Sequence, residues 1–219
     1  MKIASEGWGT ISVVFLVALI LQFLVLLIAI SVLSWITGVL LSAVVVLVVF
    51  FFRDPERECP AESSTIYSPA DGKVVQIETI EETLYMKQKA IQISIFLSPL
   101  NVHVNRVPAS GSIEFVQYVP GVNLMAWEKE ASELNERANF GLLHPSGYKL
   151  LFRQITGFLA RRISYDLQEG DQVDSGQRFG IMKFGSRMDV VIPENSHVLV
   201  QIGDTVQAAT SVLAEWPSD

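Results

Sequence analysis

Hydrophobic residues are distributed very unevenly along the chain. From Gly7 to Phe52 there is no charged residue, and Ile11–Phe52 is almost continuously apolar. As one straight helix, those 42 residues would extend about 63 Å, twice the roughly 30 Å of a bilayer's hydrocarbon core. The stretch must therefore fold back, tilt heavily or lie partly outside a membrane. Its weaker helix formers gather near the middle, at Ser31, Ser34, Thr37 and Gly38. We predict two helices, near residues 11–30 and 37–52, joined by a tight turn.

Basic residues flank the apolar stretch and orient it. Lys2 precedes the two predicted helices, while Arg53 and Arg57 follow them. Cytoplasmic loops carry an excess of lysine and arginine, so the whole downstream chain is expected on the cytoplasmic side of the cell membrane. A cleaved signal peptide is not expected, because the apolar stretch is far too long for one. Residues 1–52 are therefore predicted to be a membrane-anchoring helical hairpin, with a buried hairpin of a soluble protein as the alternative.

The pattern changes after the apolar stretch. Residues 53–66 are charged, contain Pro55 and Pro60, and are typical of a linker. Beyond them, short runs of alternating character are separated by Gly, Pro and Asn, at Lys73–Ile77, Ile91–Leu97, Ile113–Tyr118, Lys149–Ile155, Val190–Ile192 and Val198–Gln201. This pattern predicts a mostly β domain over residues 67–219, with a compact antiparallel fold resembling a sandwich or barrel. Residues 158–164 fit either a strand or a short helix.

Charge and cysteine content exclude several functional classes. The 219 residues carry a formal net charge of −7, with a pI near 5.0. No basic face is therefore expected for binding nucleic acid. The single cysteine, Cys59, excludes an internal disulfide framework and a thiolate-rich metal site. We expect neither a bound metal nor a nucleic-acid partner.

One dipeptide near the C-terminus combines features needed for peptide self-cleavage. Gly185-Ser186 lies between two apolar, strand-like runs, Phe179–Phe184 and Met188–Ile192. Glycine has no Cβ, so the carbonyl before the serine is open to attack. The Ser186 hydroxyl can attack that carbonyl if a base removes its proton and the fold holds the strain. The dipeptide alone is a weak signal, because most such pairs, including Gly111-Ser112, are typical of turns.

Five sequence blocks stand in a fixed order between Ser68 and Pro193. They are Ser68-Pro-Ala-Asp-Gly-Lys-Val74, Phe96-Leu-Ser-Pro-Leu-Asn-Val-His-Val-Asn-Arg-Val-Pro-Ala-Ser-Gly111, Asn135-Glu-Arg137, Gln154-Ile-Thr-Gly-Phe-Leu-Ala-Arg-Arg-Ile163 and Phe184-Gly-Ser-Arg187. Together they resemble phosphatidylserine decarboxylase in its short, archaeal-type form. Five blocks in order make this resemblance far more specific than any one block would be.

The resemblance implies a self-processing proenzyme. Ser186 would attack the carbonyl of Gly185, and elimination and hydrolysis would convert Ser186 into a covalent pyruvoyl cofactor. The products would be a long chain of residues 1–185 and a short chain of residues 186–219. The pyruvoyl ketone would form a Schiff base with phosphatidylserine and act as the electron sink for decarboxylation to phosphatidylethanolamine. The membrane and a second copy of the chain, in a homo-oligomer, are the other expected partners.

The resemblance also assigns an acid–base pair. His103 lies in a polar alternation of an extended segment, and the matching histidine of the family does proton chemistry. The aspartate that matches Asp71 orients the histidine base in this family, whereas Asp71 by itself is typical of a turn. The longer bacterial form has a second histidine where this chain has Arg106. Either His103 takes over the cleavage step, or the base is arranged differently here.

Arginines in these blocks are candidates for binding the substrate. Guanidinium groups match the oxygens of a phosphate or carboxylate, and Arg106 and Arg187 are the two expected at the site. Arg161 and Arg162 are further candidates, and solvation at the surface is the alternative for each arginine.

Two other functions stay open. Ile181-Met-Lys183 superficially matches the modified hairpin of lipoyl and biotinyl carriers, so a membrane-tethered carrier modified at Lys183 is one alternative. A pyruvoyl-dependent decarboxylase of another amino acid is the other, although the membrane hairpin favours a lipid substrate.

Overall fold

A computed structural model describes residues 2–28, 31–122, 124–128, 130–157, 163–182 and 186–217. The chain divides into two compact units, Met1–Glu56 and Arg57–Asp219.

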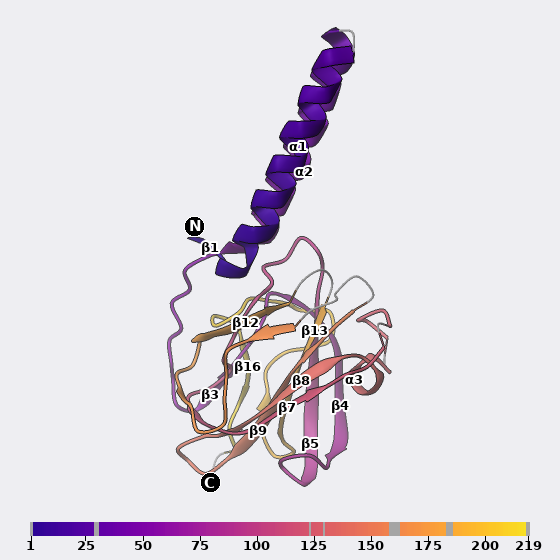
Figure 1. The fold of residues 1–219 in the computed structure, drawn as a ribbon. Helices are drawn as coiled ribbons and strands as arrows, with labels where there is room; N and C mark the ends of the chain where they lie inside the picture. The colour runs from indigo at the N-terminus through magenta and orange to yellow at the C-terminus, as the bar shows by residue number, and fades with distance from the viewer. Residues whose placement is uncertain are drawn as a thin grey trace. The chain divides into compact units, whose positions relative to one another are not determined.

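The first unit is a hairpin of two apolar helices, α1 (Trp8–Ile28) and α2 (Ser31–Phe51), which run side by side (Figure 1). Each helix has 21 residues, which corresponds to about 31 Å and nearly the thickness of a bilayer core. Their large apolar side chains are mostly exposed. By length and composition, both helices can cross a membrane.

One polar residue of α1 joins the two helices. Gln22 donates from Nε2 to the carbonyl oxygen of Ser34 at 3.0 Å, and its Oε1 accepts from Thr37 Oγ1 at 3.2 Å. Hydrogen bonds between helices in lipid contribute about 0.6–2 kcal/mol each. This cluster therefore fixes the register of the hairpin.

The second helix begins earlier than predicted, at Ser31 rather than near residue 37. The physical reason is that its weak helix formers are satisfied inside the helix. Thr37 Oγ1 lies 3.1 Å from the carbonyl oxygens of Leu33 and Ser34, a bonding mode open to threonine within a helix. The turn predicted between residues 30 and 37 therefore belongs to α2, and the residues that connect the two helices, 29 and 30, lie outside the described residues.

Two short strands close the base of the hairpin. β1 (Lys2–Ile3) pairs antiparallel with β2 (Arg53–Asp54), and a 3₁₀ turn, η1 (Ser5–Gly7), leads into α1. Gly7 is required there, because a Cβ would lie 2.5 Å from the ring of Phe52. Residues 53 and 54 are thus a strand, although the sequence indicated the start of a linker.

The second unit is built of antiparallel strands in three sheets (Figure 1). The largest has eight strands in the order β11-β7-β8-β9-β13-β5-β4-β15, and two three-stranded sheets have the orders β10-β12-β6 and β14-β16-β3. The predicted fold class, a mostly β antiparallel domain after a helical hairpin, is confirmed. The bounds are β3 Thr65–Tyr67, β4 Gly72–Glu82, β5 Gln88–Leu97, β6 Val104–Arg106, β7 Gly111–Val119, α3 Ala131–Leu134, β8 Arg137–Leu143, β9 Lys149–Ile155, β10 Ile163–Tyr165, β11 Gln172–Val173, β12 Arg178–Met182, β13 Ser186–Pro193, β14 His197–Val198, β15 Thr205–Val206 and β16 Val212–Glu215.

Side-chain alternation gives the large sheet two different faces. The inner face carries the main hydrophobic core, to which β13 contributes Met188, Val190 and Ile192. Phe140 lies at the centre of an aromatic cluster, with its ring 5.1 Å from Phe152 and 5.3 Å from Phe179. The outer face is polar near the start of β13, and two of the sites described below lie on it.

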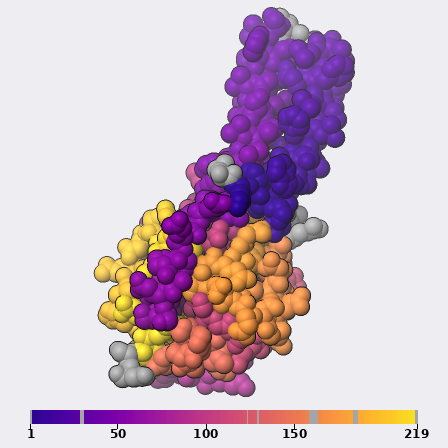
Figure 2. Space-filling model, turned by 90° about the vertical axis from the view of Figure 1, so that its left-hand side faces the viewer, coloured from indigo at the N-terminus to yellow at the C-terminus, as the bar shows by residue number. Residues whose placement is uncertain are grey.

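Some predicted segments differ in the structure. The strand expected at Val198–Gln201 is limited to β14, His197–Val198. Part of the expected linker belongs to the domain, because residues 57–64 run over its surface beside the C-terminal segment (Figure 2). Arg57 donates to Gln207 there at 2.9 Å. Of the segment 158–164, which was left open between strand and helix, residues 163–164 belong to strand β10 and 158–162 lie outside the described residues.

Replacing Phe140 by alanine should destabilise the domain by about 3–5 kcal/mol, because it removes a fully buried ring from the aromatic cluster and leaves a cavity. Chemical denaturation of the detergent-solubilised chain measures this. Tyr118→Ala is the control, since Tyr118 is 51 % exposed and should change stability by only about 0.5 kcal/mol. Equal effects of the two variants would contradict this description of the core.

Candidate active site

Ser186 is the first residue of β13, and its side chain lies on the inner face of the large sheet. It pairs with Leu97 of β5, a residue of the main core, and is fully buried. Among the described residues its Oγ has no hydrogen-bond partner. Gly185 and Lys183 lie outside the described residues, in the connection from β12 to β13. A buried hydroxyl without a partner costs free energy, so its retention indicates a role other than folding.

His103 lies at the other end of this connection, beside the last residue of β12. It directly precedes β6, and its carbonyl oxygen accepts from the amide of Met182, the last residue of β12, at 3.2 Å. The ring is fully buried, and Nδ1 lies 3.0 Å from the carbonyl oxygen of Asn101. Since a carbonyl oxygen only accepts, Nδ1 carries the proton in the neutral ring and Nε2 holds the basic lone pair. The fold thus brings a histidine with an oriented ring to the end of β12, four residues before Ser186.

A buried amide pair, absent from our sequence-based candidates, lies beside Ser186 on the inner face. Gln154 of β9 pairs with Met188, two residues along β13 from Ser186, and donates to Asn105 Oδ1 of β6 at 2.8 Å. Both side chains are fully buried, and Asn105 Nδ2 and Gln154 Oε1 have no partner within the described part of the chain. If both amides were flipped, one would still donate to the other, and one donor and one acceptor would remain.

Glycine at position 180 lets this amide pair form. A Cβ on Gly180 would lie 3.0 Å from Gln154 Nε2 and 2.3 Å from the carbonyl oxygen of Ser164. Asn105 and Gln154 both stand in the sequence blocks quoted above, so the blocks themselves were the signal for them. Their chemistry was missed because an amide in a strand is usually a solvated or structural group.

Asp71 is placed differently from the expectation that it orients the histidine. Its Oδ2 accepts from Arg57 Nη2 at 2.8 Å, and its Oδ1 accepts from the amide of Ala208 at 2.9 Å. His103 is not among the partners of this carboxylate in the described part of the chain. The ion pair is largely buried, with side chains 14 % and 12 % exposed. In this structure Asp71 therefore ties the first residue of the domain to a loop near its C-terminus.

Arg106 points toward that same region. Its Nη1 donates to the carbonyl oxygen of Gly176 at 3.1 Å, and its amide donates to Pro69 at 2.9 Å. Side chains three residues apart in an extended strand point to opposite faces, so His103 and Arg106 could reach one site only through a bend or bulge near residues 104 and 105. The irregularity lies instead on the partner strand β12, between Arg178 and Gly180.

Arg187 lies on the outer face, opposite in direction to Ser186, and is fully buried. Four hydrogen bonds engage its guanidinium: to Asp189 Oδ1 at 2.7 Å, the carbonyl oxygen of Glu128 at 3.1 Å, Gln76 Oε1 at 2.9 Å and Ser94 Oγ at 2.6 Å. These contacts favour a positioning role over the expected substrate-binding role. Arg187 fixes the start of β13, and with it the residue before it.

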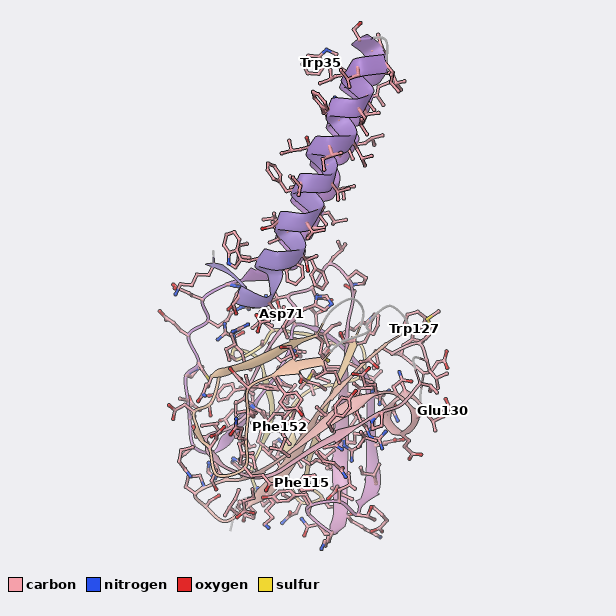
Figure 3. All side chains as sticks on the ribbon, in the orientation of Figure 1. Trp35, Asp71, Phe115, Trp127, Glu130 and Phe152 are labelled. Carbon is pink, nitrogen blue, oxygen red and sulfur yellow. The ribbon has the colours of Figure 1, made fainter. Side chains whose placement is uncertain are left out.

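The segment over the outer face is tied down by two polar residues. Ser132 of α3 donates to Asp189 Oδ2 at 2.6 Å. Asn135 is fully buried, and its amide bonds both Leu124 and Thr156. The same segment carries Trp127 and Glu130, which lie along one edge of the domain (Figure 3). The Asn135-Glu-Arg137 block therefore attaches this segment to the outer face of the sheet.

Comparisons with known proteins agree with the order of the blocks. The family model for phosphatidylserine decarboxylase matches residues 45–214. A phosphatidylserine decarboxylase proenzyme of Salinibacter ruber is 56% identical over 173 residues, 78% of this chain and 76% of the relative. Proenzymes of the same name from Symbiobacterium thermophilum and Chlorobium chlorochromatii are 40% and 43% identical, over 98% of this chain and 96% and 100% of the relatives. These matches do not favour a carrier modified at Lys183. The chain belongs to the phosphatidylserine decarboxylase family.

Proposed function

We propose that this chain is the precursor of a pyruvoyl-dependent decarboxylase that converts phosphatidylserine to phosphatidylethanolamine. The observation that carries the proposal is the position of Ser186, a buried serine without a partner among the described residues, which opens a central strand after a glycine. Family membership supports the substrate, since the relatives are named phosphatidylserine decarboxylase proenzymes.

In the proposed self-cleavage, the Ser186 hydroxyl attacks the carbonyl carbon of Gly185, and the peptide C–N bond breaks to leave an ester. Loss of the Ser186 α-proton then expels the Gly185 carboxylate, so the serine oxygen remains on residue 185. The dehydroalanine at residue 186 takes up one water and releases one ammonia to become a pyruvoyl group. The products are chains of residues 1–185 and 186–219.

His103 is proposed to move the protons. Its ring is held through Nδ1 by the Asn101 carbonyl, which leaves Nε2 as the basic atom. A neutral imidazole in this tautomer can accept the Ser186 hydroxyl proton and return it to the departing amide nitrogen. Arg106 and Asp71 have other proposed roles. Asp71 is proposed to support the site by holding Arg57. Arg106 is proposed to bind an anionic group of the substrate.

The residues around position 186 fit a pyruvoyl group. Such a group supplies an electrophilic carbonyl for the substrate's primary amine and an adjoining carbonyl that accepts the electron pair left by CO₂. Asn105 and Gln154 offer one donor and one acceptor on the same buried face. We propose that the donor holds a carbonyl oxygen at position 186 and that the acceptor orients the substrate ammonium.

The hairpin supports a membrane location for this chemistry. Residues 1–52 are proposed to be the anchor, 67–219 the catalytic domain and 53–66 the connection, which from Arg57 onward is part of the same compact unit as that domain. The domain is proposed to lie on the cytoplasmic side because of Lys2, Arg53 and Arg57. Self-association into a homo-oligomer is part of the proposal and can be measured by mass in detergent. CO₂ release from phosphatidylserine but not from free serine distinguishes the lipid substrate from another amino acid.

Intact-mass analysis should find fragments 1–185 and 186–219 in the purified chain. Their summed mass should exceed that of the uncut chain by one water minus one ammonia, whereas simple hydrolysis would add one whole water. Ser186→Ala should stay folded, uncut and inactive, because alanine has neither a nucleophile nor a route to a pyruvoyl group. An active sample that contains only the uncut chain would end the proposal.

His103→Ala should cut or decarboxylate at least about a hundredfold more slowly, the usual size of a general acid–base contribution. Following both cleavage and CO₂ release separates the two steps. His144→Ala is the control, since His144 lies in the turn between β8 and β9 and bonds Ser146. If His103→Ala matches the parent in both steps, another group is the base.

Asp71→Asn and Arg57→Gln should have the same consequences, because each breaks the same ion pair. We expect a loss of about 1–2 kcal/mol in stability for either variant, with a similar small slowing of cleavage. Denaturation and timed gels provide both readouts. Arrest of cleavage in Asp71→Asn alone would instead show that Asp71 acts on the histidine.

A further inference from the structure

A row of polar side chains crosses the outer face of the large sheet. The strand registers place one polar residue from each of six neighbouring strands directly opposite the next. Ordered from β4 to β7, they are Gln76, Ser94, Asp189, Arg153, Asn139 and Gln117. A row of this kind needs every charge compensated, because much of it is shielded from water.

Asp189 is the only carboxylate in the row, and each of its oxygens accepts a hydrogen bond from a group other than Arg153. Asp189 accepts from Arg187 Nε at Oδ1 and from Ser132 Oγ at Oδ2. Arg153 is buried, with 9 % of the residue exposed. It makes one long hydrogen bond, from Nη1 to Gln92 Oε1 at 3.5 Å, and its Nε has no partner in the described part of the chain.

A second arginine adds another positive charge beside Arg153. Arg137 of β8 lies on the same face, and its Nη1 donates to the carbonyl oxygens of Glu133 at 2.5 Å and Asn135 at 3.2 Å. Neither arginine has a carboxylate within ion-pair distance among the described residues. Burial and the positive charge of Arg153 lower the pKa of Arg137, against the opposing effect of Glu133. A buried cation beside a second, partly buried cation is unfavourable unless an anion compensates the two charges.

Both arginines line one pocket. Its volume is about 570 Å³, and Gln92 and Ser132 also face it. The rim is acidic, with Glu78, Glu81, Glu130 and Glu133, and Glu130 lies at the edge of the domain beside α3 (Figure 3). Glu82 also lines the pocket, but it is buried and its carboxylate accepts from the backbone amides of residues 84–87. A cationic floor calls for an oxyanion, while the acidic rim disfavours a bare polyanion and attracts an ammonium group.

We propose that Arg137 and Arg153 form a binding site for the oxyanion of a small zwitterion, with its phosphate or carboxylate on the two guanidinium groups and its ammonium at the glutamate rim. The site is separate from the reacting centre, because Arg153 and Ser186 lie on opposite faces of the sheet. Phosphate–ammonium chemistry of this kind exists both in free phosphoamines and in aminophospholipid headgroups.

The test is a thermal-stability titration of the full chain in detergent with O-phosphoethanolamine, at constant ionic strength. Stabilisation should saturate in the parent and require at least about tenfold more ligand in Arg153→Met and in Arg137→Met, the loss expected from removing a charge-assisted hydrogen bond. Lys89→Met is the matched control, since it removes one exposed positive charge and should leave the titration unchanged. Inorganic phosphate should bind more weakly than the zwitterion.

Two further arms locate the ligand and its source. Binding should persist in Ser186→Ala, which cannot form the proposed cofactor, so the outcome does not depend on the proposed function. Stabilisation of the parent in phosphatidylcholine nanodiscs by added phosphatidylethanolamine would assign a lipid headgroup, and stabilisation by the soluble compound alone would assign a free metabolite.

One result from the ligand-free protein is also decisive. Arg153→Met should be at least as stable as the parent, because it removes an uncompensated buried charge, whereas loss of a structural arginine would lower the melting temperature. The proposal is overturned if no probe stabilises the parent, or if stabilisation is unchanged in both arginine variants.

Discussion

The alternation of side chains along β13 is the constraint on which the site depends. Ser186 faces inward and Arg187 faces outward, so one strand serves the core and the outer face at once. The buried ion pair of Arg187 with Asp189 fixes the start of this strand, and removing one member of such a pair costs about 3–5 kcal/mol. A serine that must meet a backbone carbonyl in one geometry needs such a fixed position. The outer network thus supports the chemistry proposed for the inner face.

Polar groups without partners occur on both faces of this strand. Ser186 Oγ, Asn105 Nδ2 and Gln154 Oε1 gather on the inner face, and Arg153 Nε lies on the outer face, all without partners among the described residues. Folding alone would eliminate such groups, since each costs about 1–3 kcal/mol. Their retention is understandable if each contributes to binding or chemistry. The inner set matches the proposed reaction, and the outer arginine matches a separate ligand.

Much of the fold could be predicted from the sequence, because its signals are local. The uncharged stretch before Arg53 predicted two helices, and alternating runs predicted antiparallel strands. The start of α2 was predicted too late, since Thr37 bonds carbonyl oxygens of its own helix. Gln22 of the other helix also bonds Thr37 and the Ser34 carbonyl oxygen, a contact between segments that no local pattern contains.

The site was predictable only where a sequence block marked it. Ser186 and His103 were proposed in this way, and in the structure they lie at the start of β13 and beside the end of β12. The partners of Asp71 and Arg187 could not be predicted, because Arg57, Ala208, Gln76 and Ser94 become their neighbours only in the tertiary fold. Asn105 and Gln154 meet for the same reason.

The central claim is that residue 186 becomes the group that binds the substrate amine. Reducing the purified chain with cyanoborohydride in the presence of phosphatidylserine, followed by mass spectrometry of the separated fragments, tests it directly. The account predicts lipid attached covalently to the first residue of fragment 186–219, and none in Ser186→Ala. Lipid attached to Lys183 or another lysine, or an active enzyme that acquires no lipid on this fragment, would contradict it.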